Sequence, residues 1–253
     1  MTSLGDAPFH ILEQIDSTNN YAMGQISQSD IEEWSAYFAW QQTQGKGQRG
    51  KGWNSDRGKN ILLSFVLRPH KLFLQHQFSL SATVALGAFD FFKNYAGDSC
   101  SIKWSNDIYW CDRKAGGILI ENVLRGNHWA YAVVGIGINI NQLEFPDSLP
   151  NPISLAQITG KQYDALQLAK ELLSFVAKRY KDLQEGNSQN ILSAYQQVLY
   201  RRNEPCSFRK NGQHFSGIIS GVEPDGKLVI ITSSGRKAFD FGEIEFVITP
   251  EHR

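Results

Sequence analysis

Residues 42–53 read QTQGKGQRGKGW, a stretch that is rich in glycine, lysine and arginine and contains no acidic residue. Its glycines allow backbone conformations that other residues resist, and they let the main chain approach a ligand closely. Oriented N–H groups and fixed cations both stabilise an anion, so a loop of this composition suits phosphate. A solvated surface loop without a ligand is the alternative, because polar loops are common.

The stretch is not a P-loop, although Gly45, Gly50 and Lys51 match the spacing G-x-x-x-x-G-K. The next residue is Gly52, where the P-loop motif needs Ser or Thr to hold Mg²⁺. A P-loop also opens a helix, whereas residues 60–67 (NILLSFVL) are short, apolar and followed by Arg-Pro, which predicts a strand. With a further strand at 35–41, we predict a strand, a basic glycine loop and a second strand.

The composition is that of a globular protein with a substantial core. Of 253 residues, 42% are hydrophobic, and the equal numbers of basic and acidic residues, 25 each, give a net charge of zero. Broad electrostatic binding to nucleic acid or membrane is therefore not favoured. Three widely spaced cysteines without a C-x-x-C pair predict free thiols. We see no signal peptide and no membrane span, and expect a cytoplasmic protein.

Hydrophobic periodicity and turn residues predict the remaining elements along the chain. Long helices are expected where apolar residues recur at spacings of three and four, and strands where they alternate. The predicted strands are 9–15, 102–104, 108–110, 114–123 and 131–141, and the predicted helices are 18–27, 77–93, 165–183 and 190–199. From residue 205 onward, five short strands separated by turns predict a small SH3-like β-barrel. We expect two domains, residues 1–200 and 201–253.

The hairpin at residues 101–121 (SIKWSNDIYWCDRKAGGILIE) is the second informative stretch. A single lysine or aspartate in a hairpin is usually solvated. Here Lys103, Asn106, Asp107 and Lys114 lie on strands that flank one turn, so they can gather phosphate donors and an Mg²⁺ ligand in a small volume.

Residues 131–141 (YAVVGIGININ) contain G-x-G but lack the third glycine of a dinucleotide fingerprint. Glycines inside a strand let another backbone or a ligand come close. By period-two alternation Asn139 and Asn141 share one face. We place this face toward the site, while a satisfied core amide is at least an equal alternative.

Taken together, QTQGKGQRGKGW at 42–53, KWSNDI with K-x-GGILIE at 103–121, and GIGININ at 135–141 resemble the biotin–protein ligases. The DSTNN segment at 16–20 is similar to the fourth signature of that family. The motifs occur in the family's order and span most of residues 10–160. The resemblance implies an α+β fold, with a mixed, mostly antiparallel sheet packed with helices as in class II synthetases, and a small C-terminal barrel. Only about eight residues precede the first predicted strand, so we expect the monofunctional form without a DNA-binding domain.

The resemblance implies a two-step reaction with ATP, biotin and Mg²⁺. The biotin carboxylate attacks the α-phosphorus of ATP and gives biotinyl-5'-AMP and pyrophosphate. A lysine of a biotin carboxyl carrier protein then takes the biotinyl group and releases AMP. The glycine loop is the expected lid over the acyl-adenylate, which excludes water from it. No DNA or membrane partner is expected, and a homodimer is left open.

The resemblance also implies roles for individual residues, which fall into four groups. The expected catalytic residues are Lys103, Asp107 and Lys114. The expected biotin contacts are Ser17, Thr18, Asn19, Gln42, Lys46, Gly47, Gln48 and Lys114. The expected ATP and adenylate contacts are Arg49, Lys51, Trp53, Lys103, Asn106 and Asn139, and the expected Mg²⁺ ligands are Asn106 and Asp107. Ser17–Asn19 also suit helix capping, which is compatible with ligand binding.

The chain departs from the family pattern in two places. Where the family commonly reads G-R-G-R-R-G-R, this chain has Lys46, Gln48 and Lys51, so two planar forks become point charges and one charge is lost. Ser105 replaces the proline that is usual in K-W-P-N-D. A lipoate- or octanoate-transferring enzyme of related fold is the alternative function, and a non-catalytic nucleic-acid-binding protein is the alternative from another class.

Overall fold

A seven-stranded sheet forms the larger part of the computed structural model, which describes residues 4–70 and 72–248. The strand order is β1-β2-β3-β7-β6-β5-β4, and all neighbouring strands are antiparallel except β1 and β2. The strands are β1 (Phe9–Leu12), β2 (Ala36–Ala39), β3 (Ile61–Leu67), β4 (Cys100–Lys103), β5 (Asp107–Trp110), β6 (Arg113–Arg125) and β7 (His128–Ile138).

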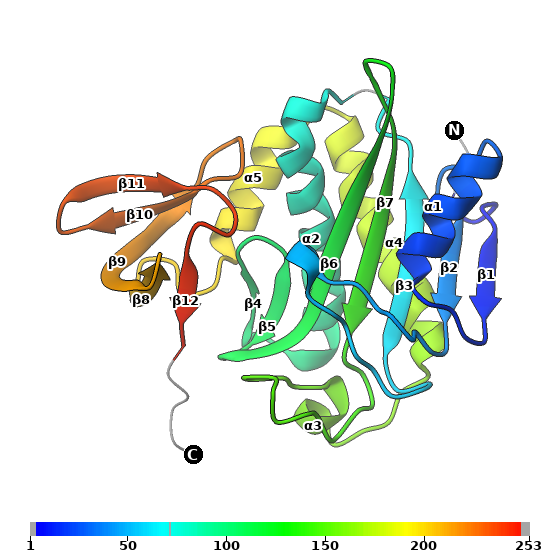
Figure 1. Cartoon of the computed structure of the whole chain (residues 1–253), viewed down its shortest axis with the longest axis horizontal. Coiled ribbons are helices and arrows are strands. Elements are labelled where there is room, and N and C mark those ends of the chain that lie inside the picture. The colour runs from blue at the N-terminus through cyan, green and yellow to red at the C-terminus, as the bar shows by residue number, and fades with distance from the viewer. Residues whose placement is uncertain (1–3, 71, 249–253) are drawn as a thin grey trace.

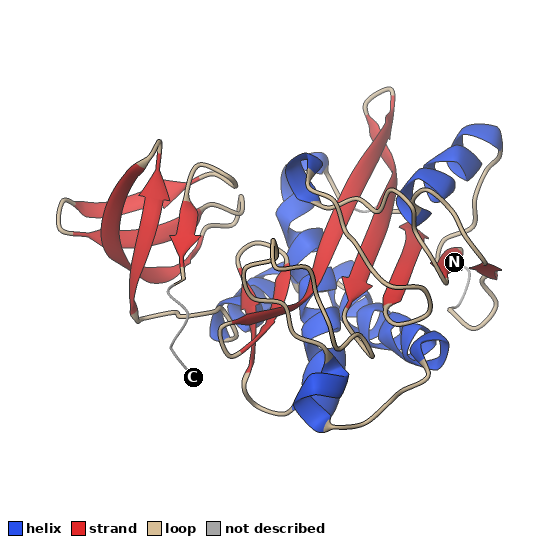
Figure 2. Ribbon diagram, turned by 60° about the horizontal axis from the view of Figure 1, so that its bottom comes forward, coloured by secondary structure: helices blue, strands red, loops and turns tan. Residues whose placement is uncertain are grey.

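Helices cover the two faces of this sheet unequally, as Figures 1 and 2 show. The helices are α1 (Thr18–Gln28), α2 (Gln77–Ala96), α3 (Leu155–Thr159), α4 (Ala165–Gln184) and α5 (Ser188–Gln197), with short 3-10 turns η1 (Gln48–Gly50) and η2 (Leu74–His76). The long helices α2 and α4 pack together on one face. The opposite face carries α1 at one end and the glycine loop across its middle.

Alternation along the central strands explains the two faces. In β3, Ile61, Leu63 and Phe65 join the main core under α2 and α4, whereas Val66 joins the smaller cluster under α1. Successive side chains of a strand point to opposite faces, so the residues between them must face the other way. The open face therefore receives Ser64 of β3 together with residues 135 and 137 of β7 and residues 117, 119 and 121 of β6.

A separate five-stranded sheet follows the last helix. Its strands are β8 (Pro205–Lys210), β9 (Gln213–Val222), β10 (Leu228–Thr232), β11 (Gly235–Phe239) and β12 (Glu245–Val247), in the order β11-β10-β9-β8-β12. All neighbouring pairs are antiparallel. We call residues 205–247 the small domain.

The small domain is packed against the large sheet beside β4 and β5 (Figure 1). Trp104 Nε1 donates to Gly226 O at 2.9 Å, and the Trp104 ring lies 5.6 Å from that of Phe241. The connecting segment extends the sheet edge, because Leu199 forms a parallel bridge with Ile102 of β4. One continuous hydrophobic core runs through both parts.

Most elements predicted from the sequence are confirmed. The strand, glycine loop, strand order is present as β2 and β3, and the helices at 18–27, 77–93, 165–183 and 190–199 correspond to α1, α2, α4 and α5. The predicted hairpin and the five C-terminal strands are also present. Cys100, Cys111 and Cys206 are free, as predicted. Within the described residues no helix is both long and apolar enough to cross a membrane.

The contact between α2 and α4 gives a stability prediction at Gly87. A Cβ atom at this position would lie 2.6 Å from the Cα of Val176, so Gly87→Ala must push the two helices apart. Overpacking of this kind costs about 1–3 kcal/mol, which outweighs the gain of about 1 kcal/mol in helix propensity. We expect a lower midpoint in urea unfolding. Gly24→Ala in α1 is the matched control, because nothing lies within 4 Å of its added methyl group, and it should not lower the midpoint.

Candidate active site

The glycine loop closes on itself as it crosses the open face of the large sheet. Lys46 and Gly52 form an antiparallel bridge, and Gly47 N donates to Lys51 O at 2.6 Å. The base of the loop is closed by Trp53 N, which donates to Gly45 O at 2.8 Å. A Cβ atom at position 45 would lie 2.3 Å from Trp53 O, so this close approach requires glycine. The backbone itself therefore gives the loop its shape.

Trp53 anchors the loop on the sheet. A Cβ atom at position 137 would lie 2.5 Å from the Trp53 ring, and one at position 117 would lie 3.4 Å from it. Two glycines on β6 and β7 thus make a flat floor on which the indole rests. The indole Nε1 is buried and has no hydrogen-bond partner among the described residues. Its ring also faces Lys114, whose Nζ lies 5.9 Å from the ring centroid, within cation–π range.

A buried polar cluster lies between the start of α1 and the open face. Thr18 N and Thr18 Oγ1 donate to Gln42 Oε1 at 2.7 and 3.0 Å. Ser64 Oγ of β3 lies 2.7 Å from Thr18 Oγ1 and 2.6 Å from Asn19 Oδ1. Ser17, Thr18, Asn19 and Ser64 are all less than 5% exposed. Ser17 occupies the N-cap position of α1, but its side chain makes no capping hydrogen bond.

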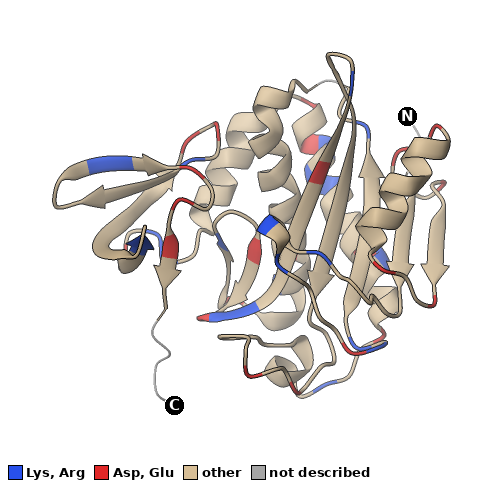
Figure 3. Ribbon diagram, in the orientation of Figure 1, with Lys and Arg blue, Asp and Glu red and all other residues tan. Residues whose placement is uncertain are grey.

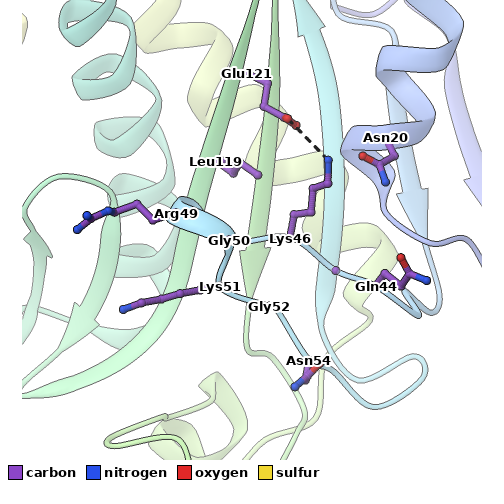
Figure 4. A pocket seen from close by; sticks show the side chains of 12 residues that line it. Asn20, Gln44, Lys46, Arg49, Gly50, Lys51, Gly52, Asn54, Leu119 and Glu121 are labelled. Atoms are coloured by element: carbon purple, nitrogen blue, oxygen red, sulfur yellow. Dashed lines mark ion pairs between the residues drawn. The ribbon is translucent and has the colours of Figure 1, made fainter. Parts of the chain in front are cut away.

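Glu121 of β6 connects this cluster to the glycine loop. Its Oε2 accepts from Asn19 Nδ2 at 2.7 Å, while its Oε1 lies 3.9 Å from Lys46 Nζ (Figure 4). Asn19 can lie so close to the sheet because position 135 is glycine. A Cβ atom there would lie 2.2 Å from Asn19 Oδ1.

A charged group lies at the other end of the loop, on the hairpin β4–β5 and the start of β6. Lys114 Nζ forms an ion pair with Asp107 Oδ1 at 2.7 Å. Asp107 is opposite Lys103 across the strands β4 and β5. The arrangement brings two ammonium groups and one carboxylate together beside the glycine floor of the sheet, as the sequence predicts.

The ammonium group of Lys103 lies against two aromatic rings. Its Nζ lies 5.2 Å from the Tyr109 ring centroid and 5.0 Å from that of Phe246, which belongs to the small domain. Burial lowers the pKa of Lys103, because the charged form loses hydration, and the nearby Asp107 carboxylate opposes this shift.

Two asparagines of the predicted site are held by the main chain. Asn106 Nδ2 and Gln48 Nε2 both donate to Ile118 O. Asn139 Nδ2 donates to Ile153 O at 3.1 Å, so its amide fastens β7 to the segment before α3. The side chains of both asparagines are therefore engaged with main-chain carbonyls, and Asn106 is next to Asp107 in the hairpin. No group of three or more His, Cys, Asp and Glu side chains suited to a metal is present in residues 4–70 and 72–248.

Comparison with known proteins identifies the family. The model of the biotin/lipoate A/B protein ligase family matches residues 11–139, and that of the biotin protein ligase C-terminal domain matches residues 203–247. The first match alone covers more than half of the chain. The chain belongs to the biotin/lipoate A/B protein ligase family.

Individual relatives agree with this assignment to a ligase family. The chain is 28% identical to a biotin–[acetyl-CoA-carboxylase] ligase of Paracoccus denitrificans over 93% of this chain and 99% of that protein. It is 28% identical to the bifunctional ligase/repressor of Escherichia coli over 92% of this chain and 72% of the relative. The biotin protein ligase of Aquifex aeolicus in complex with biotin and ATP superimposes with a TM-score of 0.79, at 25% identity, over 96% and 99% of the two chains.

The cations of the ligase loop do not converge on one point. Lys46 points toward Glu121, whereas Arg49 and Lys51 point away from it (Figure 4). Arg49 Nη1 donates to Gly242 O of the small domain at 2.8 Å. Between the loop, the start of α1 and β6 lies an open pocket of about 620 Å³. In Figure 3 the Lys and Arg residues of the loop are the blue segments where the loop crosses the front of the large sheet.

Four residues that the structure places in contact with the expected site residues were not singled out from the sequence. Ser64 left a visible signal, because it is the polar residue inside the otherwise apolar strand ILLSFVL at 61–67. Glu121 left a weaker one, because it ends the apolar run ILI at 118–120 and Asn122 follows it. Phe246 and Gly242 left none, because they reach the site only through the packing of the small domain.

The glycine floor gives a prediction about the loop of the ligase. Gly137→Ala places a methyl group inside the volume of the Trp53 ring, so the loop must lift from the sheet. We expect limited trypsin digestion to cut after Lys46, Arg49 or Lys51 at least about tenfold faster than in the parent, because cleavage follows local opening. Gly24→Ala is the control. Equal cleavage rates with unchanged circular dichroism would contradict the anchoring role of Trp53.

Proposed function

We propose that the chain is an ATP-dependent biotin–protein ligase whose reaction takes place on the open face of the large sheet. The observation that supports the proposal is that a polar cluster and a charged group lie at the two ends of the same glycine loop. A buried hydroxyl and amide cluster at Thr18–Asn19 suits an uncharged polar head group, and the charged group Lys103, Asp107 and Lys114 suits phosphates. The Aquifex aeolicus ligase of similar fold binds biotin and ATP.

In the first step, the biotin carboxylate attacks the α-phosphorus of ATP, and the bond to pyrophosphate breaks. The demand on the protein is positioning and neutralisation of phosphate charge. Lys103 and Lys114 supply two positive charges beside the floor formed by Gly117 and Gly137. Arg49, Lys51, Trp53 and Asn139 are the further ATP contacts that we propose.

In the second step, the ε-amine of an acceptor lysine attacks the acyl carbon, and AMP leaves. A free lysine is protonated in water, with a pKa near 10.4, and must lose a proton before it attacks. We propose that Asp107 takes up this proton. Its carboxylate faces the site, and its Oδ1 lies 2.7 Å from Lys114 Nζ, which it orients. The acceptor is a biotin carboxyl carrier protein of a biotin-dependent carboxylase.

The biotin contacts are assigned by position in the cluster and the loop. Ser17, Thr18 and Asn19 are buried at the start of α1, and Thr18 donates to Gln42 there. Lys46, Gly47 and Gln48 belong to the glycine loop. Trp53 closes the loop as a packing anchor. The loop acts as a lid that keeps water from the acyl-adenylate.

Mg²⁺ fits this site as an ion that arrives with ATP. Asp107 offers one carboxylate and Asn106 one amide oxygen, which at present accepts from Ser105 Oγ at 3.2 Å. Mg²⁺ often uses one or two carboxylates together with substrate phosphates. When bound, the ion would neutralise phosphate charge, with Asn106 and Asp107 as its protein ligands.

The two-domain organisation is part of the proposal. The first domain is residues 1–200, the catalytic domain. The second is residues 201–253, which includes the small domain at 205–247, and we interpret the strands of the small domain as an SH3-like barrel. Two contacts support a catalytic use of this domain: Phe246 covers Lys103, and Gly242 O binds Arg49.

The proposed function is tested by incubating the purified chain with biotin, MgATP and a biotin carboxyl carrier domain. We expect the intact mass of the carrier to rise by one biotinyl group, and we expect none when biotin or ATP is omitted. A parallel sample contains lipoate instead of biotin, because the matched family also includes lipoate ligases. Modification by lipoate alone, or by neither acid with both proteins folded, would refute the proposal.

The lowered pKa of Lys103 predicts a pH dependence of the first step. Biotin-dependent pyrophosphate exchange needs the protonated ammonium, so activity falls as pH rises through this pKa, which lies below the ordinary value for lysine. Arginine stays charged over this range. Lys103→Arg should lower the exchange rate about tenfold at pH 7.5, because the guanidinium differs in shape from the ammonium. The remaining activity should persist to higher pH than in the parent, because the arginine keeps its charge.

The control for this prediction is Lys237→Arg, an exposed position in the small domain. It should leave both the rate and the alkaline limb of the exchange reaction unchanged. If Lys103→Arg loses activity at the same pH as the parent, titration of Lys103 does not limit the exchange.

A further inference from the structure

Glu121 has no role in the reaction described above, although its carboxylate lies between the proposed biotin site and the lid. Glu121 lies on the open face of β6, and its side chain is 31% exposed. One oxygen accepts from Asn19 Nδ2, and the other faces Lys46 Nζ. It is the acidic residue among those that line the 620 Å³ pocket.

The carboxylate fixes the orientation of Asn19. An ionised carboxylate only accepts hydrogen bonds, whereas an amide side chain has one donor end and one acceptor end. Asn19 must therefore turn Nδ2 toward Glu121, and its Oδ1 must face Ser64 at 2.6 Å. Because Oδ1 accepts, the single hydroxyl proton of Ser64 is committed to Asn19.

The other end of the cluster is fixed by a main-chain donor. Thr18 N lies 2.7 Å from Gln42 Oε1, and a backbone N–H only donates, so Gln42 must turn its Oε1 toward α1. Because the Ser64 proton goes to Asn19, only the Thr18 hydroxyl can supply the proton at the 2.7 Å contact between Ser64 Oγ and Thr18 Oγ1. This single Thr18 proton is then shared between Ser64 Oγ and Gln42 Oε1, which lies 3.0 Å from Thr18 Oγ1. Gln42 Nε2 then faces away from α1, and no hydrogen bond between described residues occupies it.

We propose that Glu121 is a positioning residue that gives the Asn19–Ser64–Thr18 cluster a single hydrogen-bond direction and thereby sets its affinity for a ureido head group. This inference rests on the proposed function, because it takes biotin as the ligand. A ureido group presents a carbonyl acceptor and N–H donors at fixed places. A cluster with one direction meets it with a matching pattern, whereas a cluster that alternates between two directions matches it only part of the time.

Replacement by glutamine would remove this constraint at constant shape. Glutamine can present either end to Asn19, so Asn19 can turn over and offer Nδ2 to Ser64. The Ser64 proton is then released toward Thr18, and the direction of the cluster reverses. Glu121→Gln therefore keeps the shape of the side chain but no longer fixes which end of Asn19 faces it. This variant separates the effect of hydrogen-bond direction from that of packing.

The test is a charge swap between two contacting residues. Asn19→Asp alone places two carboxylates in contact and weakens the cluster by repulsion. In the double variant Asn19→Asp, Glu121→Gln, the glutamine amide donates to the new aspartate, and the other aspartate oxygen still accepts from Ser64. The direction of the cluster is restored, although both residues have changed. Glu185→Gln, at the exposed residue that directly follows α4, is the matched control.

Calorimetric titration with biotin alone measures the effect without catalysis. We expect Glu121→Gln and Asn19→Asp each to raise the Kd for biotin by about tenfold or more, and the double variant to recover most of that loss. Glu185→Gln should bind like the parent. In steady-state assays, the KM for biotin should rise in the Glu121→Gln variant while the KM for ATP stays unchanged.

Several outcomes would overturn the inference. Parent-like affinity of Glu121→Gln would show that the direction of the cluster does not matter. A double variant that is as weak as the two single variants combined, while its circular dichroism and thermal midpoint match the parent, would show that only shape or local charge at residue 121 matters. A parent protein that binds lipoate but not biotin would refute the proposed function itself, which is a different result from equal biotin binding by parent and variants.

Discussion

The rest of the site depends on one constraint: the side chains of Asn19 and Trp53 lie directly on the backbone of the large sheet, on its open face. Three glycines, at positions 117, 135 and 137, leave the backbone of β6 and β7 bare. Asn19 occupies the space above one of them, and the Trp53 ring occupies the space above the others. Since α2 and α4 fill the opposite face with ordinary apolar packing, the fold is held on one side and the site is built on the other.

Much of this architecture was predictable because it depends on local pattern. Alternation predicted β3 and β7, and spacings of three and four predicted α2 and α4. Gly52, where a P-loop needs Ser or Thr, indicated a loop between two strands instead of a P-loop. The charged group at Lys103, Asp107 and Lys114 was also predictable. A short antiparallel hairpin brings residues on either side of its turn together regardless of the rest of the fold.

The remaining parts of the site depend on contacts between distant segments. The sequence predicted Arg49 and Lys51 as ATP contacts and Lys46 as a biotin contact. In the structure, Arg49 donates to a carbonyl of the small domain and Lys46 faces Glu121. A main-chain acceptor such as Gly242 O is present at every residue, so the sequence carries no signal for it. The placement of Phe246 over Lys103 likewise follows from how two folded units pack, which periodicity does not encode.

The cover of Lys103 by Phe246 also has a consequence for the order of events during synthesis. Lys103 belongs to a hairpin near the middle of the chain, whereas Phe246 lies on β12, the last strand of the small sheet. Because synthesis runs from the N-terminus, Lys103 and Tyr109 leave the ribosome before Phe246 does. The Phe246 part of the aromatic cover is added only when β12 pairs with β8, so the surroundings of Lys103 are completed by the last strand of the chain.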